Sequence, residues 1–303
     1  MRLLSRRFQL PRNSPDLAYL TQIWQAEAAR IAVEHWRRHF PHCSGALLRQ
    51  LAAAGPGVSA AAIDDCGHWK ALQIAARRFF APLALSLEDT QDQMAVYVAN
   101  DSPAPWRGEL RWTLEDISGK SVEAGHGPIT AAPLSATRLQ VLDFHPWLQG
   151  EARRELVFTA ELWQGEERLA CQVSTFAPEK DMRLPDAGLE TEVEFQDGHL
   201  LVTVTAHSLA RFVELSLAGA RGTLFSDNFF DLPAMRQARV TCPLPEGWTL
   251  DQARQALQVR SLVDEMAGAE SQEKSQARIR SGLTRLANSR LNPFRQKGPP
   301  DNL

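Results

Sequence analysis

Residues 45–82, GALLRQLAAAGPGVSAAAIDDCGHWKALQIAARRFFAP, decide how this chain of 303 residues is organised. The apolar run at 45–51 predicts a strand, and the small residues after it predict a loop. Residues 67–80 show a helical pattern, whose buried side is expected at Leu72, Ile74, Ala75, Ala76 and Phe79. A strand, a loop and a helix in this order form a βα unit, which is typical of parallel sheets and barrels.

A long helix is expected before this unit. Ser14, Pro15 and Asp16 form a helix start, with serine as the N-cap, proline at the first helical position and an acid in the first turn. The helix is predicted to end near residue 40, because Pro41 follows. Its apolar residues recur at spacings of three and four, which predicts one buried face made of Leu17, Leu20, Trp24, Ala28 and Ile31.

After Pro82 the apolar residues alternate. Runs at 83–87, 94–98, 110–114, 139–141, 156–162 and 169–173 predict the six or seven strands of an immunoglobulin-like β-sandwich over residues 83–178. A linker at 177–186 leads to a second β-sandwich over 183–264, where Asp197 and Gly198 predict a hairpin turn. Residues 265–303 hold many polar and basic residues and few large apolar ones, which predicts a disordered basic tail.

The composition excludes several classes of function. A net charge of −3 gives no electrostatic argument for a nucleic-acid partner, and no apolar run is long enough for a membrane span or a signal peptide. The four cysteines (Cys43, Cys66, Cys171 and Cys242) lie far apart without a CxxC pair, which speaks against zinc and redox motifs. Free thiols favour a reducing compartment, so we expect a cytoplasmic location.

Neither the histidines nor the first acidic pair predicts a metal site. His35 and His39 are four residues apart with His42 nearby, but no third ligand or supporting carboxylate is evident. We therefore expect a solvated helix end with basic residues near its negative dipole pole. Asp64 and Asp65 are adjacent, and adjacent side chains tend to point apart, so we predict no paired-carboxylate site there.

Two further groups of residues were candidates for binding. Asp227, Asn228 and Asp231 offer too few oxygens for a full calcium site, and we expect them to form Asx turns. The chain has eight tryptophans, most of which suit sandwich cores. Trp106 and Trp147 lie in predicted loops beside prolines, so they are the candidates for stacking on a sugar ring. No metal or cofactor is predicted.

Several motifs in order resemble the C-terminal part of a β-mannosidase of glycoside hydrolase family 2, namely residues 19–20, 25–28, 34–38, 45–47, 67–72, 75–82, 208–213 and 225–232. The resemblance implies that residues 1–82 are the end of a (β/α)8 barrel, with 15–40 as a helix, 45–51 as the eighth strand and 67–80 as the eighth helix. The implied fold class is mostly β, with two immunoglobulin-like sandwiches after a partial barrel fragment (α-β-α).

The chain departs from this family at the residues that catalyse the reaction and bind the sugar. Enzymes of this family hydrolyse the glycosidic bond with retention of configuration, which requires two glutamates about 5 Å apart. In the family both glutamates lie on earlier barrel strands, and no residue here matches either one. The family's eighth-strand motif, Trp-Gln-Leu-Asn-Asp-Cys-Trp-Pro, is replaced here by Arg-Gln-Leu-Ala-Ala-Ala-Gly-Pro at 49–56, and Ala60 stands where a later Trp is expected. The resemblance therefore implies scaffold residues without the residues that bind the terminal mannose.

Three hypotheses follow. The first is a truncated or split β-mannosidase-like polypeptide, inactive alone, whose partner is a separately encoded upstream barrel chain and whose ligands are β-mannosides or manno-oligosaccharides. The second is a non-catalytic carbohydrate-binding or interaction module made of the two sandwiches. The third is a decaying gene product without a selected function.

Overall fold

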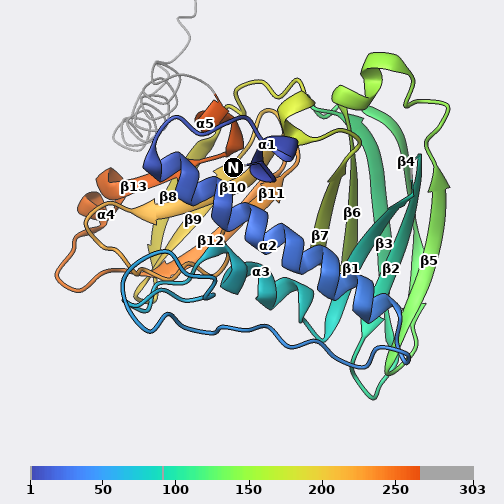
Figure 1. Cartoon of the computed structure of the whole chain (residues 1–303), viewed down its shortest axis with the longest axis horizontal. Coiled ribbons are helices and arrows are strands. Elements are labelled where there is room, and N and C mark those ends of the chain that lie inside the picture. Colours follow the sequence, from blue (N-terminus) through green and yellow to red (C-terminus); the bar gives the residue numbers. More distant parts are fainter. Residues whose placement is uncertain (1, 91, 267–303) are drawn as a thin grey trace, which may run out of the picture.

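The computed structural model describes residues 2–90 and 92–266, where a helical N-terminal part lies across two β-sandwiches (Figure 1). Its helices are α1 (Leu4–Arg7), α2 (Ser14–Arg38) and α3 (Ala71–Phe79). The start of α2 packs against Phe212 and Leu262 of the second sandwich. Its end reaches the first sandwich, where Arg37 donates a hydrogen bond to Asp101 at 2.8 Å. The helix α2 therefore contacts both sandwiches.

The long helix was predicted to within two residues, but its buried face was predicted only in part. Its N-cap is Asn13, whose side-chain oxygen accepts a hydrogen bond from the Asp16 N–H at 2.8 Å. Leu20 is buried as expected, whereas Ala28 and Ile31 are exposed. Because α3 and the sandwiches cover more than one side of α2, its buried residues also include Tyr19, Ile23, Ala26, Glu27, Val33 and Glu34. None of the helices in residues 2–90 and 92–266 combines the length and the apolar character needed to cross a bilayer.

The strand predicted at residues 45–51 does not form, so this prediction is wrong. The segment is irregular and belongs to no sheet, and the nearest pairing is a single parallel bridge between Ala52 and Ile63. Within the described residues, the backbone from 45 to 49 makes no hydrogen bond to another backbone group. A strand needs a neighbouring strand to bond with, and among the described residues only Gln50 and Leu51 of this run bond to another segment, through the backbone N–H groups of Ala62 and Ile63.

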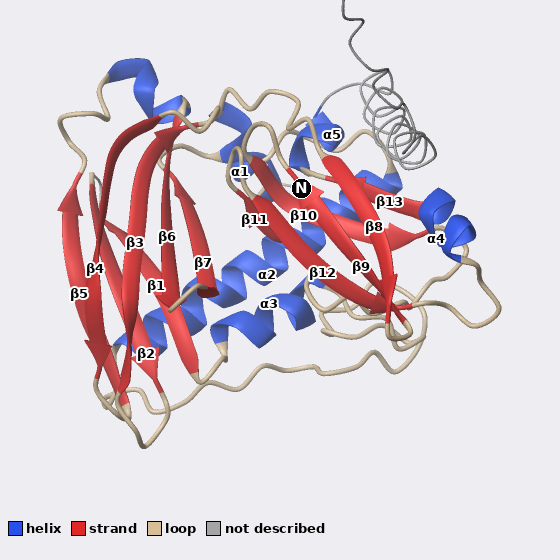
Figure 2. Ribbon diagram, turned by 180° about the vertical axis from the view of Figure 1, so that it is seen from behind, coloured by secondary structure: helices blue, strands red, loops and turns tan. Residues whose placement is uncertain are grey.

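The first sandwich packs a three-stranded sheet against a four-stranded one (Figure 2). The three-stranded sheet has the order β1 (Leu83–Thr90), β2 (Gln93–Asn100) and β5 (Ser135–Asp143). The other has the order β4 (Ser121–Ala131), β3 (Trp106–Asp116), β6 (Leu156–Gln164) and β7 (Glu167–Thr175). A 3₁₀ turn, Gly150–Arg154, precedes β6. Alternation predicted six of these strands and missed β4, which is mostly exposed and rich in small residues.

Strand β4, which the sequence pattern did not predict, has glycines for a packing reason. A Cβ atom on Gly125 would lie 2.6 Å from the indole of Trp112, which is too close for any side chain. Trp112 itself is buried in the core beside Phe144 and Phe158. Glycine lets a neighbouring strand pass over the buried indole, and this removes the alternating apolar signal by which strands are recognised.

A 3₁₀ turn, Glu179–Asp181, leads into the second sandwich. One sheet has the order β12 (Gln237–Pro243), β9 (His199–Thr205) and β8 (Glu190–Gln196), and the other has β11 (Phe230–Leu232), β10 (Ala210–Leu217) and β13 (Leu257–Arg260). Two helices, α4 (Leu250–Ala256) and α5 (Leu262–Met266), close the described chain. The hairpin is confirmed: Gln196 pairs with His199, and Asp197 and Gly198 have φ of 51° and 80°.

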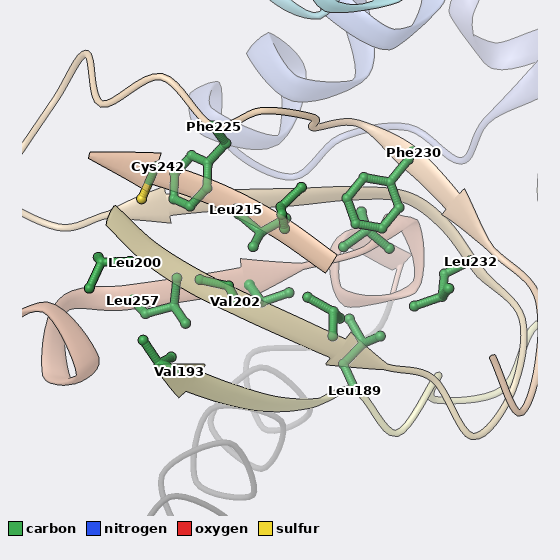
Figure 3. Packing of buried hydrophobic residues seen from close by; sticks show 14 of the residues in the cluster. Leu189, Val193, Leu200, Val202, Leu215, Phe225, Phe230, Leu232, Cys242 and Leu257 are labelled. Atoms are coloured by element: carbon green, nitrogen blue, oxygen red, sulfur yellow. The ribbon is translucent and has the colours of Figure 1, made fainter. Parts of the chain in front are cut away.

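The core of the second sandwich lies between its two sheets (Figure 3). Phe225 and Phe230 from the loop before β11 and from β11 itself face Leu215 and Val202 of the sheets. Residues 267–303, to which the prediction of a disordered tail mostly applies, lie outside the described residues.

The thiols should fall into two classes of reactivity. All four cysteines are free; Cys66 is exposed, Cys43 and Cys171 are half-buried, and Cys242 is buried. Burial raises the pKa of Cys171 to about 12 and that of Cys242 to about 11, so their reactive thiolate forms are scarce. We expect Ellman's reagent at pH 8 to label two thiols quickly and the other two only after denaturant is added. Equal rates for all four would contradict this assignment. The cytoplasmic location stays a prediction.

Candidate functional site

A buried cluster of charges lies where the helical part, the linker and the second sandwich meet. We define this charged junction as Arg7, Glu27, Arg30, Glu179 and Arg211. Glu179 is 1% exposed, and Arg7 donates from Nε and Nη2 to its two carboxylate oxygens, both at 2.6 Å. Arg211 Nη2 donates to the same carboxylate at 3.2 Å. Arg7 also donates to Glu27 at 3.1 Å, and Arg30 donates to Glu27 at 2.8 and 2.9 Å.

The surroundings of the two buried glutamates of α2 shift their pKa values in opposite directions. Burial alone would raise the pKa of Glu27, but the charges of Arg30 and Arg7 outweigh it and hold that pKa well below its usual range. Glu34 receives hydrogen bonds from Arg30 at 3.0 Å and from Gln172 at 2.6 Å, yet burial dominates and raises its pKa. The charged form is therefore favoured at Glu27 and disfavoured at Glu34.

The aspartates of the 226–231 loop bind arginines and backbone groups of the protein. Asp231 accepts from Arg211 Nη1 at 2.7 Å and from a backbone N–H at 3.1 Å, although burial raises its pKa. Asp227 accepts from Arg78 of α3 at 2.5 Å. The Asn228 side chain bonds both the N–H and the C=O of residue 215, each at 2.8 Å. These side chains brace the 226–231 loop against α3 and β10.

A cavity of about 440 Å³ opens beside the junction, between α2, α3, β7 and the 226–231 loop. Its charged walls carry equal numbers of bases and acids: Arg30, Arg77, Arg78, Arg168, Glu27, Glu34, Asp227 and Asp231. Every one of these carboxylates accepts a hydrogen bond from an arginine. A general acid or nucleophile must be free to reach a substrate, so the arrangement suits the joining of domains rather than glycoside hydrolysis.

The predicted sugar-stacking residues lie in the first sandwich. Trp106 begins β3 and its ring lies over Gly108, where a Cβ would be 2.3 Å from a ring carbon. Trp147 lies between β5 and β6, edge-on to Phe144 with ring centroids 6.4 Å apart. Both side chains are half-buried and pack against the core. The structure does not bring them together with the charged junction, and their role in sugar binding stays a prediction.

The histidines of α2 and the Asp64–Asp65 pair, for which no metal site was predicted, make contacts within the protein. His35 and His39 stack with ring centroids 4.3 Å apart, and His39 Nδ1 lies 2.8 Å from the His35 carbonyl. The expectation that Asp64 and Asp65 point apart is wrong: their oxygens and the Cys66 sulfur lie within 4.8 Å of one another. Asp64 already accepts the Cys66 N–H at 2.9 Å, which forms an Asx turn.

One part of the chain exposes several large apolar side chains in succession. We call Trp36, Phe40, Leu47, Leu51 and Val58 the apolar stretch; each is at least 41% exposed, and Leu47 and Val58 are fully so. From Phe40 onward the chain runs beneath α2 and α3 along the lower edge of Figure 1. Single exposed apolar residues are ordinary, but five large ones within 23 residues are more than isolated exposure accounts for.

Comparison with protein-family models identifies both sandwiches. Residues 92–181 match a mannosidase Ig/CBM-like domain, and residues 184–265 match an Ig-fold domain of mannosidases. Among curated proteins, β-mannosidase A of Aspergillus fumigatus is 25% identical over 283 residues, which cover 85% of this chain and 30% of that protein. β-Mannosidase of Capra hircus is 34% identical over 110 residues, which cover 32% of this chain and 12% of that protein.

Solved structures share the fold over the same extent. β-D-Mannosidase from Dictyoglomus thermophilum matches with a TM-score of 0.78 and 23% identity, covering 86% of this chain and 31% of that one. The exo-chitosanase of Amycolatopsis orientalis matches with a TM-score of 0.60 and 14% identity, covering 86% and 35%. This chain thus spans about 30% of the length of the curated relatives that match most of it. It is a relative of the β-mannosidases of glycoside hydrolase family 2 and corresponds to the C-terminal part of such a protein.

Proposed function

We propose that this chain supplies the non-catalytic C-terminal part of a β-mannosidase-like glycoside hydrolase and hydrolyses no β-mannoside by itself. The observation that carries the proposal is the match over 85% of this chain to only 30% of a β-mannosidase. The resemblance leaves both catalytic glutamates without a counterpart here. The carboxylates that line the 440 Å³ cavity offer no substitute, since each accepts a hydrogen bond from an arginine.

The partner that we propose is a β/α-barrel polypeptide, carried on a separate chain, that holds the two glutamates and covers the apolar stretch. Two features support this occupant. Residues 45–49 make no backbone–backbone hydrogen bond in the described structure, so their backbone groups are available to add as a strand to a barrel. The exposed side chains of Leu47, Leu51 and Val58 would then be removed from water.

We expect the purified chain alone to release no nitrophenol from an aryl β-mannoside. Mixing it with a barrel polypeptide that contains both glutamates should produce a stable complex in gel filtration. Leu47→Asp should weaken that association about tenfold or more, because a charge would be buried in an apolar contact. Leu134→Asp is the matched control, since Leu134 is also exposed but lies in a turn of the first sandwich. Turnover by the chain alone would overturn the proposal of an inactive part, and equal binding by both variants would overturn the docking surface.

A carbohydrate-binding module is the second candidate function, favoured by the CBM-like description of residues 92–181. Trp106 and Trp147 are the side chains proposed to stack on manno-oligosaccharides. Titration of the intrinsic fluorescence with mannohexaose should then change the emission, and Trp147→Ala should reduce that change. A flat response in the unaltered chain would argue against this candidate.

A further inference from the structure

The long helix α2 carries its charges on the sides that face the rest of the protein. Every Asp, Glu and Arg of residues 14–38 is buried or half-buried. The residues that α2 exposes between 17 and 36 are Ala18, Thr21, Ala28, Ile31, His35 and Trp36. A helix at the surface of a globular protein normally has the opposite arrangement, with charged residues toward water and apolar residues toward the core. The exposed side of α2 therefore has the composition of a side that packs against protein.

Five residues on this side form one stripe. We define the uncharged face of α2 as Leu17, Thr21, Trp24, Ala28 and Ile31, which recur at alternating spacings of four and three. Thr21, Ala28 and Ile31 are exposed, Ile31 to 53%, and Leu17 and Trp24 are half-buried. In Figure 1 α2 crosses in front of both sandwiches, and in Figure 2 it lies behind the strands. Within the described part of the chain, the uncharged face is thus left largely open to water.

Covering the uncharged face would remove few polar groups from water. The Thr21 hydroxyl donates to the Leu17 carbonyl at 2.7 Å within the helix, so it keeps its hydrogen bond when it is buried. Leu17, Ala28 and Ile31 have no polar side-chain atom, and the indole N–H of Trp24 is a single donor that needs one acceptor. Burial is unfavourable mainly for polar groups that lose their hydrogen bonds, so a partner could cover this face at little cost.

The spacing of the face indicates what kind of structure fits it. Residues separated alternately by four and three positions occupy the a and d positions along which two helices pack. The large side chains of Leu17, Trp24 and Ile31 alternate here with the smaller ones of Thr21 and Ala28. A second helix can place its own large apolar side chains in the spaces above the two small residues. A β-strand, whose side chains on one face repeat every two residues, does not match this stripe.

The uncharged face continues into the apolar stretch. Trp36, the first residue of that stretch, lies on α2 itself beyond Ile31. Gln25 of the same helix donates to the Ala60 carbonyl at 2.6 Å, which ties α2 to the chain just after the stretch. A β/α-barrel has an outer ring of helices around its strands, so one barrel polypeptide can present a helix to the uncharged face and a strand edge to residues 45–49. A second copy of this chain that paired through α2 would account for the face alone.

We propose that the uncharged face of α2 packs against a helix of the barrel polypeptide. This inference rests on the proposed function and adds to it a second contact surface and the chemistry of the partner there. The partner helix is uncharged along the contact and carries large apolar side chains opposite Thr21 and Ala28. The apolar stretch and the uncharged face together form one interface with one partner.

The test is the affinity of the full chain for a barrel polypeptide that contains both glutamates, measured by isothermal titration calorimetry. Ala28→Glu should weaken the association at least tenfold, because a carboxylate would be buried between two helices. Ala28→Leu should also weaken it, since the added side chain fills the space that a residue of the partner enters. Ala132→Glu is the matched control and should leave the affinity unchanged, since Ala132 is also exposed but lies between β4 and β5. Circular dichroism and the urea midpoint of each variant alone establish that it is folded.

The outcomes separate this inference from the proposed function. If Leu47→Asp weakens the complex and Ala28→Glu does not, the proposed function stands and the contact through α2 is overturned. Absence of any complex with the unaltered chain would overturn both. Sedimentation of the chain alone tests the other occupant: dimers that Ala28→Glu separates would show that a second copy covers the face, which also overturns the inference. A tighter complex with Ala28→Leu would contradict the packing of a helix into the space above Ala28.

Discussion

Glu179→Gln is expected to lower the free energy of unfolding by about 3 kcal/mol, the size of loss seen when one partner of a buried ion pair is removed. Glu179 is almost completely buried and accepts hydrogen bonds from Arg7 and Arg211. Glutamine keeps the shape but removes the charge, so Arg7 and Arg211 each lose one of their two carboxylate partners. Urea unfolding followed by tryptophan fluorescence measures the change.

The control for this variant is Glu151→Gln. Glu151 also pairs with two arginines, Arg154 and Arg183, but its side chain is 62% exposed, so its loss should leave the urea midpoint almost unchanged. Arg7→Lys is a milder change at the junction that keeps the charge and loses the two-pronged contact with Glu179, and an intermediate effect is expected. A cost for Glu179→Gln no larger than that for Glu151→Gln would show that the junction contributes little to stability.

The elements with strong local signals were predictable from the sequence. Pro15 and Asp16 place the start of α2, although the N-cap is Asn13 and not the predicted Ser14, and Asp197 and Gly198 place a hairpin because both must take positive φ. The alternating strands of both sandwiches follow from their half-buried sheets. In each case the residues that specify the element lie next to one another in the chain.

The features that the sequence did not predict correctly depend on residues that lie far apart in the chain. The 45–51 run reads as a buried strand, yet a strand forms only beside a partner that the run itself does not specify. Strand β4 was missed because its pattern is set by Trp112, a residue on the neighbouring strand. Likewise Glu27 and Arg30 are visible as a pair three residues apart, but Arg7 joins Glu179, 172 residues away. The charged junction is specified by tertiary proximity, so spacing in the sequence could not find it.

The two glutamates of α2 should respond in opposite ways to the loss of their charge. Glu27→Gln is expected to cost about 3 kcal/mol at pH 7, because it leaves Arg7 and Arg30 without a shared counterion. Glu34→Gln should be neutral or stabilising at pH 7, because burial makes the charged form of Glu34 unfavourable in the folded chain. The amide oxygen can still accept hydrogen bonds from Arg30 and Gln172. Each variant is the matched control for the other.

The pH dependence of unfolding gives the second measure of this difference. The pKa of Glu27 is lower in the folded chain, so its stabilising effect is present above the unfolded pKa of about 4.3 and is lost as the pH falls below that value. The pKa of Glu34 is higher in the folded chain, so its penalty is present at pH 7 and disappears on acidification. The cost of Glu27→Gln should therefore stay nearly constant from pH 7 to about pH 5 and shrink only as the pH falls below about 4.3, whereas Glu34→Gln loses any stabilising effect already between pH 7 and about pH 4. Equal costs at pH 7 that do not change with pH would show that neither glutamate carries the charge assigned to it, and that Arg30 does not distinguish its two acidic neighbours.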